Sequence, residues 1–136
     1  MLEYIKRPKE LPGDTIKMKC GCGNIYITLN NLDGHMVEIF LHLGKAGQCG
    51  SSQLESLGRV ISTALRSGVE PMLFAKQLKG IRCPSTIWEN GQQILSCADA
   101  ISRAIEEEFK LLKELKGNEH ALELSDKLKS NRRKAK

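Results

Sequence analysis

A change in hydrophobic period near residue 50 constrains the fold of this chain more than any other feature. Between Thr15 and Leu43 apolar residues occupy every second position, which is the spacing of strands that bury one face. The stretches "GCGN" and "NNLDGH" interrupt this run and have the composition of turns. The pattern therefore predicts three strands that follow one another as an antiparallel meander.

The opposite face of these strands combines charged, polar and aromatic side chains. The residues predicted on it are Lys17, Lys19, Tyr26, Thr28, Met36, Glu38, Phe40 and His42. A small domain rarely leaves several large apolar side chains in water. We therefore expect Tyr26, Met36 and Phe40 to lie in a contact between copies of the chain, in a homo-oligomer.

From Ser51 onward the apolar residues recur every three or four positions, which indicates an amphipathic helix. Ser51 or Ser52 is expected to cap its start, and Gly68 is expected to end it. The polar positions predicted to face solvent on this helix are Glu55, Arg59, Ser62 and Arg66.

Two more helices are predicted after the first. The stretch "PMLFAKQLKG" has Pro71 in its first turn and indicates a short helix. Residues 80–95 contain an Asn-Gly pair and indicate an irregular loop or a hairpin. A third helix is expected at "SCAD", where Ser96 and Asp99 can form a capping box. The sequence thus predicts an α+β fold, a three-stranded antiparallel sheet backed by two to three helices.

The length of 136 residues, 40% of them hydrophobic, suits one core. We expect Gly117-Asn118 to break the third helix, so that the domain covers residues 1–117 and residues 118–136 form a short polar helix and a basic tail. The net charge of +5 comes from this tail, because residues 126–136 hold six basic groups and one acid. The tail is predicted to be a solvated end rather than a specific reader of nucleic acid.

The glycine-rich stretch "HLGKAGQCGSS" leads from the last strand into the first helix, and such a turn presents N–H groups that suit a phosphate. It lacks the ending of the phosphate-loop motif, so a tight structural turn is the alternative. Arginines and a loop aromatic further along suit phosphate and base recognition, with solvated charges and a core tryptophan as the alternative. The candidate ligand-binding residues are Gly44, Lys45, Gly47, Ser51, Ser52, Arg59, Arg66, Arg82, Trp88 and Asn90.

No apolar run reaches the ~18 residues of a membrane span, and the N-terminal residues lack the apolar core of a signal peptide. We therefore expect a cytoplasmic protein without a membrane partner. Its five cysteines are an odd number, which favours free thiols or metal ligands over a disulfide framework.

Four of the cysteines are predicted at the ends of elements, where thiols can converge on a tetrahedral zinc ion. These candidate ligands are Cys22, Cys49, Cys83 and Cys97. Burial as small hydrophobic residues is the alternative, and no other cofactor is indicated. A nucleophilic Cys49 with His35 or His42 as base is the enzymatic alternative, but nothing in the sequence places a histidine beside it, so we do not expect an enzyme.

Four stretches carry a resemblance to a known family, and they are "RPKELPGDTIKMKCGCGNIYITLN", "EIFLHLGKAGQCGSSQLESLGRVISTALRSGVEP", "KQLKGIRCPS" and "LSCADAISRAIEE". In this order they resemble the TSCPD domain found near the C-terminus of adenosylcobalamin-dependent ribonucleotide reductases, over roughly residues 7–108. The resemblance implies an accessory role. The matching pattern includes Cys22, Cys49, Cys83 and Cys97, with Gly44, Lys45, Gly47, Arg59, Arg66, Gly68 and Arg82.

The chain also departs from that family. In the reductases the domain follows a catalytic barrel and precedes a cysteine-rich end, and neither is found here, so we do not expect this chain to reduce ribonucleotides by itself. The family's "TGCG" is "CGCG" here, which makes Cys20 an extra thiol, and its "SCPD" is "SCAD".

The sequence supports two hypotheses about function. The leading hypothesis is a free-standing, non-catalytic TSCPD-like module that binds a nucleotide-like phosphate ligand as an oligomer. Its specific version is a sponge with which a phage sequesters a nucleotide immune signal. The alternative is an accessory subunit that docks on a ribonucleotide reductase, with zinc as a structural clamp.

Overall fold

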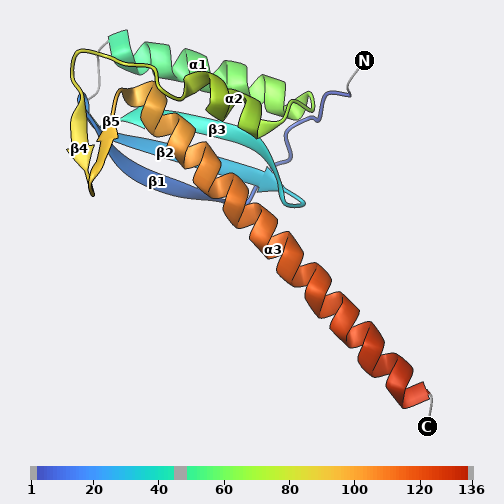
Figure 1. Cartoon of the computed structure of the whole chain (residues 1–136). Coiled ribbons are helices and arrows are strands. Elements are labelled where there is room, and N and C mark those ends of the chain that lie inside the picture. Colours follow the sequence, from blue (N-terminus) through green and yellow to red (C-terminus); the bar gives the residue numbers. More distant parts are fainter. Residues whose placement is uncertain (1–2, 45–48, 135–136) are drawn as a thin grey trace.

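The computed structural model describes the backbone of residues 3–44 and 49–134 and, within the last helix, the side chains up to Asn118 and that of Lys127. The elements are β1 (Gly13–Cys20), β2 (Gly23–Leu32), β3 (His35–Leu43), α1 (Cys49–Arg66), α2 (Pro71–Leu78), β4 (Ile87–Glu89), β5 (Gln92–Ile94) and α3 (Cys97–Lys134). They confirm the predicted α+β fold with its three-stranded antiparallel sheet and C-terminal helix (Figure 1).

The three long strands pair in the order β1-β2-β3, as expected of a meander. Cys20 pairs with Gly23, so that a two-residue turn joins β1 to β2. In the turn between β2 and β3, Asp33 and Gly34 have positive φ angles of 51° and 77°, the conformation that tight hairpin turns require. Both turns lie where the sequence predicts them.

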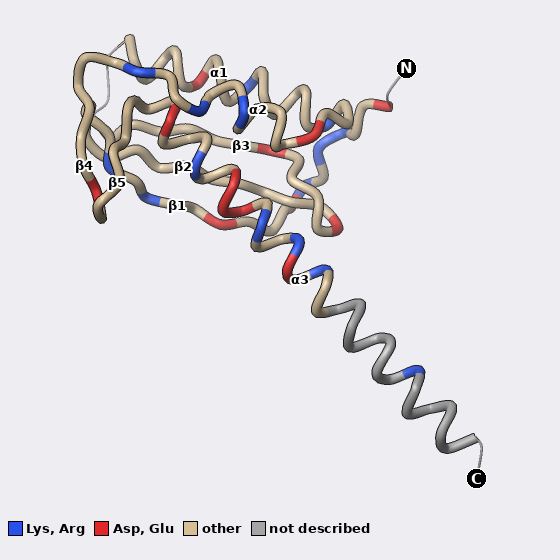
Figure 2. The backbone as a smooth tube through the Cα atoms, viewed as in Figure 1, with Lys and Arg blue, Asp and Glu red and all other residues tan. Residues whose placement is uncertain are grey.

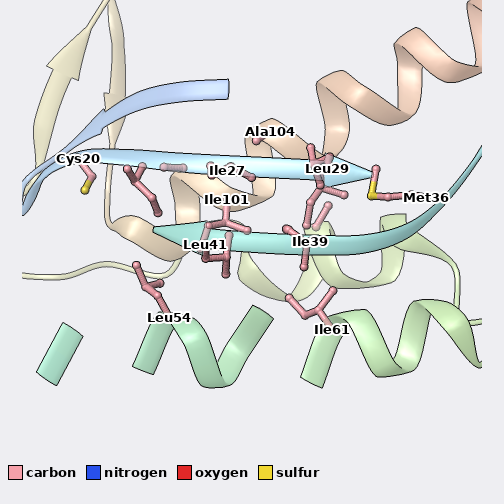
Figure 3. Packing of buried hydrophobic residues seen from close by; sticks show 14 of the residues in the cluster. Cys20, Ile27, Leu29, Met36, Ile39, Leu41, Leu54, Ile61, Ile101 and Ala104 are labelled. Atoms are coloured by element: carbon pink, nitrogen blue, oxygen red, sulfur yellow. The ribbon is translucent and has the colours of Figure 1, made fainter. Parts of the chain in front are cut away.

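The hydrophobic core lies on one face of this sheet. Ile27 and Leu29 of β2 are fully buried there, in one cluster with Ile101 and Ala104 of α3 (Figure 3). Full burial of an aliphatic side chain of this size contributes about 1.5–3 kcal/mol. The first half of α3 is therefore part of the core rather than an appendage to it.

A β-bulge changes which side chains of β3 face the core. The register shifts between Asn30 and Asn31, because Asn30 pairs with Glu38 whereas Asn31 pairs with Met36, which leaves Val37 as the extra residue. Met36 and Val37 are both buried. The prediction that Met36 lies on the open face is therefore wrong, since alternation does not continue across a bulge.

Helix α1 covers the free edge of β3. The Ser62 hydroxyl accepts a hydrogen bond from the Ile39 N–H and donates one to the Ile39 carbonyl, both at 3.0 Å. A Cβ at Gly58 would lie 3.3 Å from the same carbonyl, so a residue this small allows the close approach. Ser62 is consequently buried, and the prediction that it faces solvent is wrong.

The end of α1 follows the sequence prediction at Gly68. Its φ is +91°, and its N–H bonds the Leu65 carbonyl while the Val69 N–H bonds the Ala64 carbonyl, each at 3.0 Å. This pair of bonds satisfies carbonyls that have no partner inside the helix. Gly68 therefore ends the helix because it takes a left-handed conformation at low cost.

The Ser96 half of the predicted capping box at the start of α3 is present, but Asp99 accepts from Leu95 and Gly80 rather than from the Ser96 N–H that a capping box uses. The Ser96 hydroxyl accepts from the Asp99 N–H at 3.1 Å. The Asp99 carboxylate accepts from the backbone N–H groups of Leu95 and Gly80, each at 3.1 Å. Asp99 thus joins the end of the α2 segment to the start of α3.

Helix α3 continues without interruption past Gly117, so the predicted break at Gly117-Asn118 is wrong. A glycine inside a helix costs about 1 kcal/mol relative to alanine, and the Leu, Lys and Glu residues that precede it are strong helix formers. Beyond the core, α3 extends away from the sheet (Figure 1). No helix of the described residues is both long and apolar enough to span a bilayer.

Replacing Ser62 by alanine should lower the free energy of unfolding by about 1–3 kcal/mol, because the N–H and carbonyl of Ile39 lose their partner in a buried place. Urea denaturation measures the change. The matched control is Thr63→Ala, whose hydroxyl bonds the Arg59 carbonyl at the exposed surface. Equal stabilities of the two variants would contradict the role of Ser62.

Candidate functional site

The predicted ligand-binding residues fall into three places. Gly44 is exposed after β3, and Ser51 and Ser52 lie in the first turn of α1; Lys45 and Gly47 lie outside the described residues. Arg59 and Arg66 lie further along α1. Arg82, Trp88 and Asn90 belong to the α2–β4 segment and the β4–β5 hairpin, and all three are exposed.

Trp88 lies on the β4–β5 hairpin. Asn90 and Gly91 form its turn with φ angles of 51° and 75°, which confirms the hairpin interpretation. Trp88 is 71% exposed, so the alternative of a core tryptophan is wrong. The Lys19 N–H donates to Glu89 of β4 at 3.4 Å, which places the hairpin at the end of the sheet where β1 ends.

A groove of about 370 Å³ lies between β3 and α1, and both predicted arginines of the helix, Arg59 and Arg66, line it. Its lining residues are Glu38, Ile39, Phe40, Leu41, Glu55, Gly58, Arg59, Ser62, Thr63 and Arg66. Phe40 is 52% exposed and provides an apolar wall. The exposed Arg59 side chain contacts Glu55 at 2.9 Å, one turn away on the same helix.

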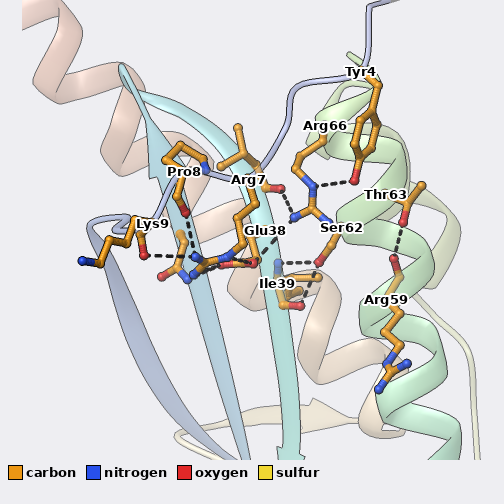
Figure 4. A network of polar contacts seen from close by, with 12 residues as sticks. Tyr4, Arg7, Pro8, Lys9, Glu38, Ile39, Arg59, Ser62, Thr63 and Arg66 are labelled. Carbon is orange, nitrogen blue, oxygen red and sulfur yellow. Dashed lines mark hydrogen bonds and ion pairs between the residues drawn. The ribbon is translucent and has the colours of Figure 1, made fainter.

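A buried carboxylate lies at one end of this groove. Glu38 is only 3% exposed although it belongs to the open face of the sheet. Arg7 and Asn30 donate to its two oxygens at 2.7 Å each, and the Arg66 guanidinium lies 3.6 Å away (Figure 4). Arg66 also donates to the Tyr4 hydroxyl at 3.2 Å.

This network fixes the charge of Glu38. Burial opposes ionisation, but the hydrogen bonds from Arg7 and Asn30 and the charges of Arg7 and Arg66 outweigh it and lower the pKa of Glu38. Arg66 is mostly buried by these contacts, contrary to the prediction that it faces solvent. Its role in the groove is therefore partly structural.

Sequence reasoning missed this cluster. Arg7 and Glu38 lie 31 residues apart, so no local periodicity links them. The signal that the sequence offers is a single charged residue inside the apolar run from Met36 to Leu41, because a charge among buried neighbours needs a partner.

Two thiols lie in contact at the start of α3. The Cys20 and Cys97 sulfurs are 3.2 Å apart, with Cys20 buried and Cys97 half-buried. The hydrogen bond with Cys97 lowers the pKa of Cys20 to about 6 against the opposing effect of burial, aided by the backbone N–H groups of Cys22 and Gly23. The bond with Cys20 raises the pKa of Cys97, and burial raises it further.

The four predicted zinc ligands do not form one site, although Cys22 and Cys97 are neighbours and Cys22 helps to raise the pKa of Cys97. Among the described residues, no three His, Cys, Asp or Glu side chains are grouped so that they could hold a metal ion. Cys22 and Cys49 are exposed, and Cys97 contacts Cys20, which the family pattern leaves out. We derive no role for zinc from this arrangement, and its presence stays a prediction.

The comparison with family models decides which family this fold represents. The model described as the TSCPD domain matches residues 2–109. The chain belongs to the TSCPD domain family. The match covers the meander, α1, α2, the hairpin and α3 as far as Phe109, whereas the rest of α3 lies beyond it. Searches of curated proteins and of solved structures found no match to this TSCPD protein.

The charge of this TSCPD domain is mixed rather than concentrated. Lys and Arg are interspersed with Asp and Glu over the sheet and the helices that cover it (Figure 2). The groove itself combines Arg59 and Arg66 with Glu38 and Glu55. The groove therefore offers individual guanidinium groups rather than a general positive field.

Replacing Glu38 by glutamine should lower the free energy of unfolding at pH 7 by about 1.5–3 kcal/mol, the range for hydrogen bonds to charged groups. The folded-state pKa is depressed, so the contribution of Glu38 is present above the unfolded pKa near 4.3 and is lost as pH falls through the folded value. The difference between wild type and variant should therefore shrink in acid.

Urea denaturation at pH 7 and at successively lower pH measures this difference. Glu55→Gln is the control, because its pair with Arg59 is exposed and contributes little. A Glu38→Gln effect that is independent of pH would contradict an ionic role for Glu38.

Proposed function

We propose that this TSCPD domain is a non-catalytic binding module that takes a nucleotide-like, phosphate-bearing ligand as an oligomer. The observation that carries the proposal is the groove between β3 and α1, where two arginines and an exposed aromatic side chain line one surface. A guanidinium group suits phosphate, and an aromatic face suits a base.

Arg59 is the phosphate partner in this proposal. It is exposed, and its neighbour Glu55 is exposed as well, so their ion pair is weak and its loss costs little. Arg66 is held by Glu38 and Tyr4 and is less available. We therefore assign the direct contact with the phosphate to Arg59. Arg66 contributes the shape and the positive charge at one end of the groove.

The first turn of α1 extends this surface. Ser52, Glu55 and Arg59 follow one another at helical spacing on the same side of α1. Ser52 lies about 10 Å from Arg59 along the axis, which is the scale of one nucleotide. A ligand in contact with Arg59 could thus also reach the N–H groups at the start of α1.

Exposed aromatic surface supports the oligomer. Phe40 stands on the open face of the sheet, with Tyr26 half-buried nearby on β2. Contact with a second copy would cover this face and wall the groove from the other side. In the specific version of the proposal, such an oligomer is a phage sponge that sequesters a nucleotide immune signal.

One feature supports the alternative of docking on a ribonucleotide reductase. Leu111 and Leu115 are exposed on α3 near the point where it leaves the core. Exposed leucines on a projecting helix suit a groove on a partner protein. Binding of nucleotides to the isolated protein separates this alternative from the leading proposal.

Calorimetry with a panel of linear and cyclic nucleotides tests the ligand. Arg59→Ala should weaken binding about tenfold to a hundredfold, the equivalent of about 1.5–3 kcal/mol for a charged hydrogen bond. Lys76→Ala on α2 is the control, because it removes one exposed positive charge away from the groove. The proposal is wrong if no nucleotide binds the wild type, or if both variants weaken binding equally.

Light scattering tests the oligomer. Phe40→Asp should reduce the mass to that of the monomer, whereas Val60→Asp, a change at an exposed apolar residue of α1, should leave the mass unchanged. A wild-type monomer at micromolar concentration would exclude the oligomer and leave the nucleotide proposal to the calorimetry.

A further inference from the structure

Two thiols from distant parts of the chain meet where β1 ends and α3 begins. We propose that Cys20 and Cys97 are an oxidisable pair, which a small peroxide converts into an intrachain disulfide. This inference is independent of the proposed ligand, because it depends only on the contact between the two sulfurs.

The geometry of the pair is close to that of a disulfide. The sulfurs are 3.2 Å apart, and a disulfide bond is about 2.05 Å long, so they need to approach by about 1.2 Å. Cys97 is the first residue of α3 and is only half-buried, which leaves its side chain room to rotate toward Cys20.

The surroundings hold both thiols in place. Cys20 is paired with Gly23 across the β1–β2 turn and belongs to the hydrophobic core. A Cβ at the neighbouring Gly21 would overlap the Ser85 backbone, so the turn lies directly against the segment that precedes β4. Ser96, next to Cys97, is fixed by its bonds to Ile81 and Asp99.

The burial of Cys20 limits which oxidants can reach the pair. Cys20 is 4% exposed, so bulky reagents do not reach it, whereas hydrogen peroxide has nearly the size of water. Cys22, in the same turn, is exposed and offers a bulky reagent a different target. A small peroxide is therefore the reagent that can react with the buried Cys20 thiol.

The reaction balances in two steps. One thiolate of the pair attacks a peroxide oxygen, the O–O bond breaks, and hydroxide leaves and is protonated to water, giving a sulfenic acid. The other sulfur then attacks the sulfenic sulfur, the S–O bond breaks, and hydroxide leaves with the remaining thiol proton as a second water. Two thiols lose two electrons, and one peroxide gains them.

The disulfide would tie the end of β1 to the first turn of α3. It closes a loop from residue 20 to residue 97, which restricts the unfolded chain and raises the melting temperature. A reductant should reverse the change. Oxidation is thus expected to stabilise the end of the sheet that carries the hairpin.

The experiment treats the full chain with hydrogen peroxide, then maps disulfides by digestion and mass spectrometry and measures the melting temperature. We expect a Cys20–Cys97 disulfide, a higher melting temperature and reversal by dithiothreitol. The Cys22→Ser variant should behave as wild type, and Cys97→Ala should show neither change. Circular dichroism checks that each variant is folded.

Three results would overturn the proposal. They are peroxide treatment that leaves both thiols reduced in folded protein, a disulfide that maps to another pair, and stoichiometric zinc in the native mass spectrum that is lost in Cys97→Ala. Because wild type is mapped directly, the result does not depend on the folding of a variant.

Discussion

The hydrogen bonds between Ser62 and the backbone of Ile39 decide how this domain is assembled. A sheet edge presents unpaired N–H and carbonyl groups, and one hydroxyl here satisfies both kinds at a buried position. Gly58 permits the approach, so α1 lies along the edge of β3 instead of on a face of the sheet. One face is thereby left for α3 and the core, and the other stays open.

The position of α1 also creates the groove. A helix beside a strand edge forms a groove with the open face of the sheet. Side chains of α1 that are three or four residues apart line one wall of this groove, and β3 lines the other. Arg66 reaches Glu38 from this direction, which lets a carboxylate remain ionised although it is buried. Arg59, two turns earlier on α1, is exposed and pairs only with the exposed Glu55 among the described residues.

Local patterns predicted the elements well, because strand alternation, the glycine stop at Gly68 and the Ser96 cap each depend on neighbouring residues. The family was recognised from ordered motifs and is confirmed by the family match. The wrong predictions concern side chains whose partners are distant in the sequence. Ser62 has the spacing of a solvent-facing position on α1, and its actual partner is the backbone of Ile39 in β3. The contact of Cys20 with Cys97 spans 77 residues, and no spacing reveals it.

Because α3 is one continuous helix, its buried and projecting halves exchange amide hydrogens with solvent by different routes. Ile101 and Leu112 are buried, whereas every described residue from Lys113 to Asn118 is exposed. Amide hydrogens of the first half are released to solvent only when the core opens, but those of the projecting half need only fraying of the helix. One unbroken helix therefore contains two levels of local stability, and a protease that cuts the outer part would leave the sheet and its groove intact.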